Sequence, residues 1–278
     1  MTTTLRPTEP LQQHPDGTRS RRYQVCVNGR PVGGVRVSTH PEYGHGVARL
    51  EDLHIEEPDR GRGRGTVAVL AAEEVARGWG CRRVEISVPE ESAAALRLAT
   101  ALGYVPRNRN MAKRLAGAPP ELPPGSTARP MSEDEFGPWL ADDRERFARS
   151  MITRGVPEAE AYAKADEGHV LLLPDGLATA NTLISVLEHD GTPVGTLWVG
   201  LEMALWPDAA YVLNVEVREA QRGRGHGRTL MLLAEAQGIG AGKGRIALNV
   251  FAGNTPAERL YSALGYEPTA HHLYKELC

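Results

Sequence analysis

The sequence predicts an α/β fold with a mixed central sheet flanked by helices, and it predicts that this fold occurs twice. Two observations carry the prediction. The string RGRGRG at residues 60–65 returns as RGRGHG at 222–227, 162 positions later, and ALGY at 101–104 returns at 263–266 with the same offset. Between these anchors, 19 of 46 aligned positions are identical and no gap is needed. The 278-residue chain is therefore expected to hold a duplicated unit.

Each copy follows the order strand, glycine-rich loop, helix, strand, helix. In the second copy, residues 211–217 (YVLNVEV) alternate and residues 246–250 (IALNV) form an apolar run, so both predict strands. Apolar positions spaced three and four apart from Leu230 indicate the helix after the loop. A last helix is expected to begin at Asn254 and to be capped by Gly265.

The boundary between the copies is predicted within residues 116–125 (AGAPPELPPG), because four prolines in ten residues form a stiff, extended linker. We therefore expect a first domain over residues 21–115 and a second domain over residues 126–278. The polar residues 1–20 are expected to be disordered.

The second domain has an N-terminal part that the first lacks. Residues Ser132–Arg154 and Pro157–His169 indicate two helices, the first of which opens with a capping box. Residues Thr182–Leu201 then predict a hairpin that turns at Asp190-Gly191. The first copy has no room for the two helices, so its domain is predicted to be a trimmed version of the second.

Composition excludes several classes of protein. The formal net charge is −3 and the isoelectric point about 6.3, so neither a nucleic acid nor an anionic membrane is an expected partner. No apolar run approaches the ~18 residues of a membrane span, and the polar start does not resemble a signal peptide. The three cysteines, Cys26, Cys81 and Cys278, are odd in number and far apart, which argues against a disulfide framework and favours a cytoplasmic location.

The glycine- and arginine-rich loop between strand and helix has the features of an anion cradle. Glycines permit positive φ and the close approach of a phosphate, and the N–H groups at a helix N-terminus favour negative charge. The spacing GxGxG differs from the dinucleotide pattern GxGxxG, and no GKS or GKT makes the loop a P-loop. Taken alone, the loop also fits a flexible surface turn or a short RNA-binding segment.

In their order and spacing these elements resemble the GNAT superfamily of acyl-CoA-dependent N-acyltransferases. The family's loop pattern, Gln/Arg-x-x-Gly-x-Gly/Ala, is matched twice, by Arg222, Gly225 and Gly227 and by Arg60, Gly63 and Gly65. The family's later element is an Asn followed seven residues on by a Tyr and then by Leu-Gly-aromatic; it corresponds to Asn254, Tyr261 and residues 264–266. The resemblance covers the second domain and the core of the first. It implies two tandem GNAT-like domains, the N-terminal one trimmed.

The resemblance implies where the co-substrate acetyl-CoA would bind. Its pantetheine arm is expected to pair with the strand around Val215 and Val217, where a backbone amide would polarise the thioester carbonyl. The other implied cofactor-binding residues of the second copy are Asn254 and the loop residues Arg222, Gly223, Arg224, Gly225, His226, Gly227 and Arg228. In the first copy they are Arg60, Gly61, Gly63 and Gly65.

The resemblance also implies two catalytic residues. Glu216 is the candidate base that takes the proton of the amine, and Tyr261 is the candidate acid for the departing thiolate. Each residue has a simpler interpretation. Tyr261 also fits a core tyrosine, Glu216 fits a solvent-facing side chain, and Asn254 fits a plain N-cap. His226 occupies a variable position of the loop and is not expected to be catalytic.

The two copies differ at the proposed catalytic positions. At the offset of 162, Tyr261 aligns with Ala99, Glu216 with His54, and Asn254 with Ser92. The first copy therefore keeps the loop and loses the proposed acid. We expect the chemistry in the C-terminal domain and a degenerate N-terminal domain that is structural or binds acetyl-CoA without turnover. Because a histidine can act as a base, His54 leaves open an independent activity of the first domain.

The expected function is N-acetyl transfer from acetyl-CoA to a primary amine of a small molecule, such as an antibiotic or another secondary metabolite, by direct attack. Two alternatives stay open: a protein or peptide N-acetyltransferase, and a non-catalytic acyl-CoA-binding sensor. No metal is expected, because the adjacent His271 and His272 point to opposite faces of a strand. The chain is expected to be a monomer or a homodimer.

Overall fold

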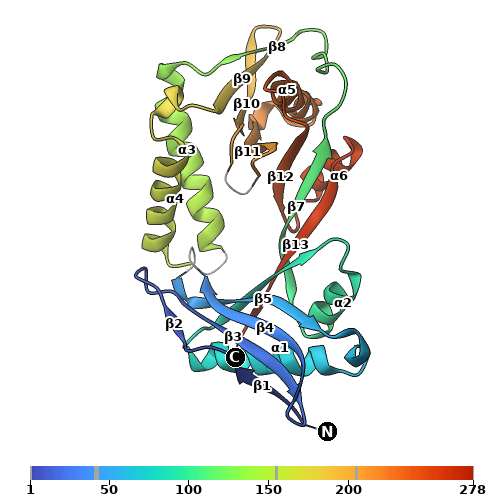
Figure 1. Cartoon of the computed structure of the whole chain (residues 1–278). Coiled ribbons are helices and arrows are strands. Elements are labelled where there is room, and N and C mark those ends of the chain that lie inside the picture. Colours follow the sequence, from blue (N-terminus) through green and yellow to red (C-terminus); the bar gives the residue numbers. More distant parts are fainter. Residues whose placement is uncertain (1, 41–43, 154–155, 204–205, 278) are drawn as a thin grey trace. The chain divides into compact units, whose positions relative to one another are not determined.

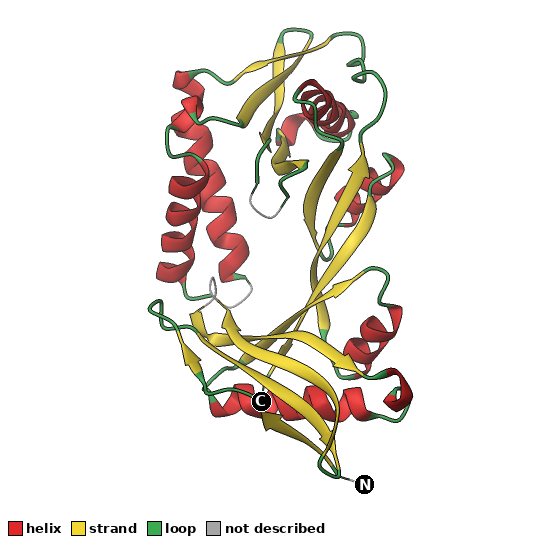
Figure 2. Cartoon of the chain, viewed as in Figure 1, coloured by secondary structure: helices red, strands yellow, loops and turns green. Residues whose placement is uncertain are grey.

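The computed structural model of the protein describes residues 2–40, 44–153, 156–203 and 206–277. The chain divides into a first unit, Met1–Arg109 with Thr269–Cys278, and a second unit, Asn110–Pro268. Each unit combines helices with a sheet of parallel and antiparallel strands (Figures 1 and 2), which confirms the predicted fold class.

The first unit is built mostly of strands. They are β1 (Thr3–Pro7), β2 (Gln12–Gln13), β3 (Arg19–Val27), β4 (Arg30–His40), β5 (Gly44–Ile55), β6 (Arg83–Pro89) and β13 (Glu267–Glu276). They lie in the order β1-β3-β4-β5-β6-β13, with β2 beside β3. A 3-10 turn η1 (Glu57–Asp59) and helix α1 (Arg64–Gly78) connect β5 to β6, and α2 (Ala93–Ala101) follows β6. No α-helix precedes α1 among the described residues, which confirms the trimmed form of this unit.

The second unit has the sheet order β7-β12-β11-β10-β9-β8. Its strands are β7 (Val105–Arg114), β8 (Ser126–Pro130), β9 (Thr182–His189), β10 (Thr192–Gly200), β11 (Ala209–Val217) and β12 (Arg245–Phe251). Its helices are α3 (Glu133–Ile152), α4 (Glu158–Leu172), α5 (His226–Gly240) and α6 (Thr255–Ala263), with 3-10 turns η2 (Gly176–Ala178) and η3 (Glu219–Gln221). The expected hairpin is present as β9 and β10, and α3 opens with the expected capping box of Ser132 and Glu135. Helices α3 and α4 lie side by side (Figure 1).

Neighbouring side chains of β10 pack against helices on opposite faces of the second sheet. Leu197 packs in the core that α5 and α6 share, whereas the neighbouring Trp198 packs in a separate cluster with Trp139 of α3. The rings of Trp139 and Trp198 meet edge to face, with centroids 5.5 Å apart. One face of the sheet is therefore covered by α5 and α6 and the other by α3.

In each unit the two parallel strands pair at their beginnings and then part. The paired residues are Val47–Leu50 with Arg83–Ile86 in the first unit and Ala209–Val212 with Arg245–Leu248 in the second. β5 then continues to Ile55 and β11 to Val217 without a partner on that side among the described residues. The two registers are related by the offset of 162 found in the sequence, so the duplication extends to individual residue pairs.

The structure differs from the sequence-based expectation at two places. Residues 1–20, expected to be disordered, contain β1, which pairs with β3 from Thr3↔Val27 to Pro7↔Tyr23. The units divide at Arg109 and again at Pro268, whereas the expected boundary was the proline-rich stretch 116–125. Arg154, the expected end of a helix, lies outside the described residues. None of the helices in the described ranges is long and apolar enough to cross a membrane.

Candidate functional site

The loop between β11 and α5, predicted from the sequence to be an anion cradle, leads directly into a helix. Gly223 (φ 77°) and Gly225 (φ 87°) both have left-handed backbone, and Gly225 is the N-cap of the 15-residue helix α5. After Arg222, the next backbone N–H of the loop that donates to a backbone carbonyl is that of Arg228. Among the described residues, the N–H groups of Gly223, Arg224 and Gly225 therefore have no backbone acceptor. Such N–H groups at a helix N-terminus are suited to a phosphate.

Gly227 lets the cradle approach the last helix. A Cβ at this position would lie 3.3 Å from Cδ2 of Leu260 on α6 and 3.8 Å from Cγ2 of Val217. The guanidinium of Arg222 donates from Nε to the carbonyl oxygen of Val217, 3.4 Å away. Arg222 therefore ties the loop back to the end of β11.

His226 does not present its ring to the cradle. The side chain is buried, and its ring centroid lies 5.1 Å from that of His189 on β9. Burial, followed by the nearby His189 and Arg224, lowers the pKa of His226. Of the groups of His226, the backbone N–H is thus the one suited to an anion.

The edge of β11 beside the cradle is open to a ligand. Val215 and Val217 pair on one side with Leu197 and Gly195 of β10, while on the other side β12 has already diverged. Their side chains pack against the core shared with α5. An open strand edge pairs readily with the amides of an extended ligand.

Tyr261 lies on α6 within the same core. It is 6% exposed, and its ring centroid is 6.0 Å from that of Tyr266. Burial raises the pKa of Tyr261 to about 12, so the hydroxyl stays protonated at neutral pH. Asn254 caps the same helix, since its Oδ1 accepts from the N–H of Ala257 at 3.4 Å.

Glu216 points to the other face of the sheet, toward α3. Its Oε2 lies 2.8 Å from Nη1 of Arg146, and both side chains are about one-third exposed. One oxygen of the Glu216 carboxylate is therefore already engaged by a guanidinium.

Beside this ion pair lies a largely buried group of polar side chains that was not predicted from the sequence. Nε2 of His169 on α4 lies 2.9 Å from Oδ2 of Asp143 on α3, and Nδ2 of Asn214 on β11 donates to Oδ1 of the same carboxylate. Nη2 of Arg146 is 3.5 Å from Oδ1 of Asp143, which joins this group to Glu216. The network links three elements on the face of the sheet opposite to Tyr261.

The network forms one end of a cavity of about 270 Å³. Apolar and aromatic side chains form the other walls: Phe147, Leu172, Trp198, Leu213 and Phe251. Leu213 and Asn214 follow directly on the last paired residue of β11, so the cavity opens where the central strands part. The arrangement suits a small molecule with an apolar body and a polar end.

One signal in the sequence indicates these residues. Asp143, Arg146 and Phe147 on α3 are spaced three and four apart, and so are Ala165, Gly168, His169 and Leu172 on α4. The spacing places each set on one helix face, but the meeting of the two faces is a tertiary feature.

The first unit repeats the cradle. Gly61 (φ 70°) and Gly63 (φ 73°) are left-handed, and Gly63 is the N-cap of α1. Nε of Arg60 donates to the carbonyl oxygen of Ile55 at 2.8 Å, as Arg222 does to Val217. A Cβ at Gly65 would lie 3.3 Å from Leu98, the same distance as between Gly227 and Leu260.

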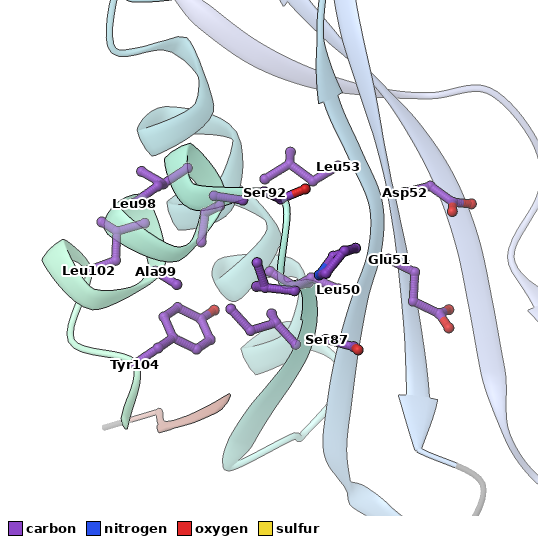
Figure 3. Close-up of a pocket in the computed structure, with 15 residues that line it drawn as sticks. Leu50, Glu51, Asp52, Leu53, Ser87, Ser92, Leu98, Ala99, Leu102 and Tyr104 are labelled. Atoms are coloured by element: carbon purple, nitrogen blue, oxygen red, sulfur yellow. The ribbon is translucent and has the colours of Figure 1, made fainter. Parts of the chain in front are cut away.

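The proposed catalytic positions differ in the first unit. Ala99 lines a cavity between β5, β6 and α2 (Figure 3) and occupies the position of Tyr261. His54, in the position of Glu216, is exposed; its Nδ1 lies 3.1 Å from the carbonyl oxygen of Asp52. Ser92 is the N-cap of α2, as Asn254 is of α6.

The two C-terminal histidines are separated by the pleat of β13. His271 contacts Glu90, whereas His272 lines a different cavity with Glu85 and Arg107. Within the described ranges, no group of three or more His, Cys, Asp or Glu residues is arranged to hold a metal ion.

Comparison with known proteins gives one family. Residues 2–104 and 141–266 match the Acetyltransferase (GNAT) family. Over 154 residues the chain is 29% identical to the uncharacterised N-acetyltransferase YdgE of Bacillus subtilis (strain 168), a match that covers 55% of this chain and 98% of that protein.

Two solved structures are similar over most of the chain. A GCN5-related N-acetyltransferase from Sphaerobacter thermophilus has a TM-score of 0.60 at 23% identity, over 92% of this chain and 80% of that one. A tandem GNAT protein from the clavulanic acid biosynthesis pathway, solved without AcCoA, has a TM-score of 0.51 at 21% identity, over 95% of this chain and 85% of that one. At these identities the structural matches show the fold alone.

Proposed function

Because the chain belongs to the acetyltransferase (GNAT) family and is an acyltransferase, we propose that its second unit transfers an acetyl group from acetyl-CoA to a primary amine of a small molecule. One observation supports this most directly. The anion cradle at Gly225 and the open edge of β11 lie on the side of the sheet that α5 covers. A cavity with a polar end opens on the other side of the sheet, which α3 covers. A thioester and an amine can thus meet from opposite faces where β11 and β12 part.

The chain's own groups fit the co-substrate. The free N–H groups of Gly223, Arg224 and Gly225 would hold its pyrophosphate, and the β11 edge at Val215 and Val217 would pair with its pantetheine amides. When bound, acetyl-CoA supplies an activated acetyl group. A backbone N–H of this strand would polarise the thioester carbonyl.

His169 is the proposed acceptor of the amine proton. Its Nε2 faces Asp143, which leaves Nδ1 as the basic nitrogen, and among the described residues Nδ1 has no hydrogen-bond partner. A carboxylate that binds one imidazole nitrogen orients the ring and stabilises the imidazolium. Glu216, the base expected from the sequence, is already paired with Arg146 and in this proposal helps to position the network.

Tyr261 is the proposed donor to the leaving thiolate. As the new N–C bond forms and the C–S bond breaks, the sulfur gains negative charge. With its pKa raised to about 12, Tyr261 is a weaker acid than the thiol that forms, so it keeps its proton and donates a hydrogen bond to the sulfur. CoA then leaves as the thiolate and takes its proton from solvent, while the proton of the amine goes to His169.

The cavity favours a small acceptor over a protein side chain. Its volume of about 270 Å³ and aromatic walls suit a compact amine with an apolar body.

Two glycines at opposite ends of α5 provide the test. Gly225 (φ 87°) in the cradle and Gly242 (φ 72°) just after α5 are both left-handed, and both have open space at the Cβ position. A β-branched residue strains either position equally. We expect release of free CoA thiol with a panel of aromatic and aliphatic amines to be lost in Gly225→Val and kept in Gly242→Val. Equal losses in both variants, or no thiol release by the wild type with any amine, would refute the proposal.

A further inference from the structure

The first unit contains a cavity of about 420 Å³ where β5 and β6 part. Most of its walls are apolar; they include Leu50, Leu53, Ile86, Leu98, Leu102 and Tyr104. In Figure 3, Leu98, Ala99 and Leu102 project from α2 on one side of the space and Leu50 lies across from them, while the carboxylates of Glu51 and Asp52 point away beyond β5.

The duplication shows why space remains here. Ala99 stands where the second unit has Tyr261, and Val69 stands where it has the fully buried Met231. Both replacements make the first unit's side chain smaller. In the second unit, Leu248 and Leu264 are 1% and 7% exposed; their counterparts Ile86 and Leu102 are only half-buried. The missing phenol ring therefore leaves apolar surface uncovered.

The cavity is adjacent to the repeated cradle. Leu98, which lines the cavity, would lie 3.3 Å from a Cβ at Gly65, the second residue of α1. The unpaired end of β5, with Leu53 in the cavity wall, therefore lies between the loop of Gly61 and Gly63 and the cavity. This strand end leads from a site for anions to apolar side chains.

We propose that the first unit binds acyl-CoA thioesters whose acyl chain is longer than acetyl, and that the chain occupies the cavity beside Ala99. This rests on the proposed function, because the first cradle is assigned by its likeness to the second. The space beside Ala99 and Val69 is additional to that in the second unit, where Tyr261 and Met231 fill it and acetyl transfer is proposed. A longer chain would cover Ile86 and Leu102, and each buried methylene is expected to tighten binding about fourfold. Bound there, the thioester has no tyrosine hydroxyl at position 99 to assist the leaving sulfur.

The experiment measures binding by native mass spectrometry and calorimetry on the full chain carrying Gly225→Val. This substitution is expected to abolish binding at the second unit, so the binding that is measured belongs to the first unit. The probes are CoA, acetyl-CoA, hexanoyl-CoA and hexanoate. We expect hexanoyl-CoA to bind at least ~10-fold more tightly than acetyl-CoA, and hexanoate without CoA to bind weakly. Equal affinities for acetyl- and hexanoyl-CoA would overturn the proposal, and so would tight binding of hexanoate alone.

Filling the cavity should remove the preference. Ala99→Tyr, and separately Val69→Met, give the first unit the side chains that the second unit already accommodates, and both should reduce the ratio of affinities toward one. Ala101→Tyr is the matched control, because Ala101 is exposed on the same helix and does not line the cavity; it should keep the ratio. A thermal unfolding scan identifies any variant that fails to fold, and the other filling variant then decides.

Failure of this proposal can be told apart from failure of the proposed function. If the wild type binds acetyl-CoA at one site that Gly225→Val removes, and the first unit binds no thioester, only the present proposal is wrong. If the wild type binds no acyl-CoA at all, both are wrong.

Discussion

Lys275, in the last strand of the chain, binds Glu73 on α1, 202 positions earlier, with its Nζ 2.8 Å from Oε2 and 3.0 Å from Oε1. The same pair recurs at the offset of 162: Nζ of Lys113 in β7 lies 2.8 Å from both carboxylate oxygens of Glu235 on α5. Each repeat thus supplies the lysine that neutralises the buried glutamate of the other. The end of β13 belongs to the first unit and the end of β7 to the second, so neither repeat contains a complete unit.

Removing Lys275 should destabilise the first unit strongly. The side chain of Glu73 is 1% exposed, and in Lys275→Met its charge is left buried without its cation. Breaking a buried ion pair in this way costs about 3–5 kcal/mol. We expect the free energy of unfolding of Lys275→Met, measured by urea titration, to be lower than that of the wild type by this amount.

Two variants control this prediction. Lys243→Met removes a lysine whose Nζ contacts the carbonyl oxygen of Pro207 at 3.3 Å, and it should change stability little. The double variant Glu73→Leu with Lys275→Met removes both charges and should recover most of the loss. If Lys275→Met alone is as stable as the wild type, the buried charge of Glu73 does not need Lys275, and the prediction is wrong.

The sequence predicts the local elements and their repetition, but not which ends of the chain complete each unit. The loops at Gly63 and Gly225 are readable because left-handed backbone before a helix demands glycine. The exchange of β7 and β13 is not readable, since either strand has residues that fit either sheet. β1 was missed because TTLRP has only one large apolar side chain, Leu5, which packs against the first unit's core.

The residues of the candidate site also fall into those that the sequence predicts and those that it does not. The loop residues and Tyr261 follow from short motifs within one repeat. The group of Asp143, His169 and Asn214 does not, because its members come from three elements and each residue alone is unremarkable in sequence. Glu216 was a candidate because of its place on the strand, but its pairing with Arg146 depends on how α3 packs.

Replacing Tyr261 by Phe should lower turnover with little effect on folding. The change removes only the hydroxyl, and loss of one hydrogen-bond donor aimed at developing negative charge costs roughly 100-fold in rate. Tyr266→Phe is the matched control, since Tyr266 is also buried and its ring lies 6.0 Å from that of Tyr261. The measurement is kcat for thiol release with the best amine of the panel. If Tyr261→Phe and Tyr266→Phe behave alike, Tyr261 is a core tyrosine.

His169→Gln should lower turnover strongly. In this variant the proton of the attacking amine loses its proposed acceptor, so kcat for thiol release is expected to fall about 100-fold. Asp143→Asn should act in the same direction by releasing the ring of His169. Glu216→Gln is expected to lower kcat much less. If instead Glu216→Gln lowers kcat about 100-fold and His169→Gln does not, Glu216 is the base.

His272 should make the first unit sensitive to acid. Burial, then the charges of Arg107, Arg49 and His271, lower the pKa of His272 to about 4, while in the unfolded chain an ordinary histidine titrates near pH 6.5. Between these two values the unfolded chain binds a proton that the folded chain does not. Stability from this group is therefore complete above about pH 6.5 and is lost as the pH falls toward 4, by up to about 3 kcal/mol.

The variant pair His272→Gln and His271→Gln isolates this effect. The two residues are adjacent on β13 but face opposite sides: His272 shares a cavity of about 220 Å³ with His40 and Glu85, and His271 contacts Glu90. Burial also raises the pKa of Glu85, which opposes the effect but is common to all three proteins. We expect urea unfolding at pH 7 and pH 4.5 to show a smaller difference in His272→Gln than in wild type, and an unchanged difference in His271→Gln. The reverse pattern would place the acid-sensitive group on the other face of the strand.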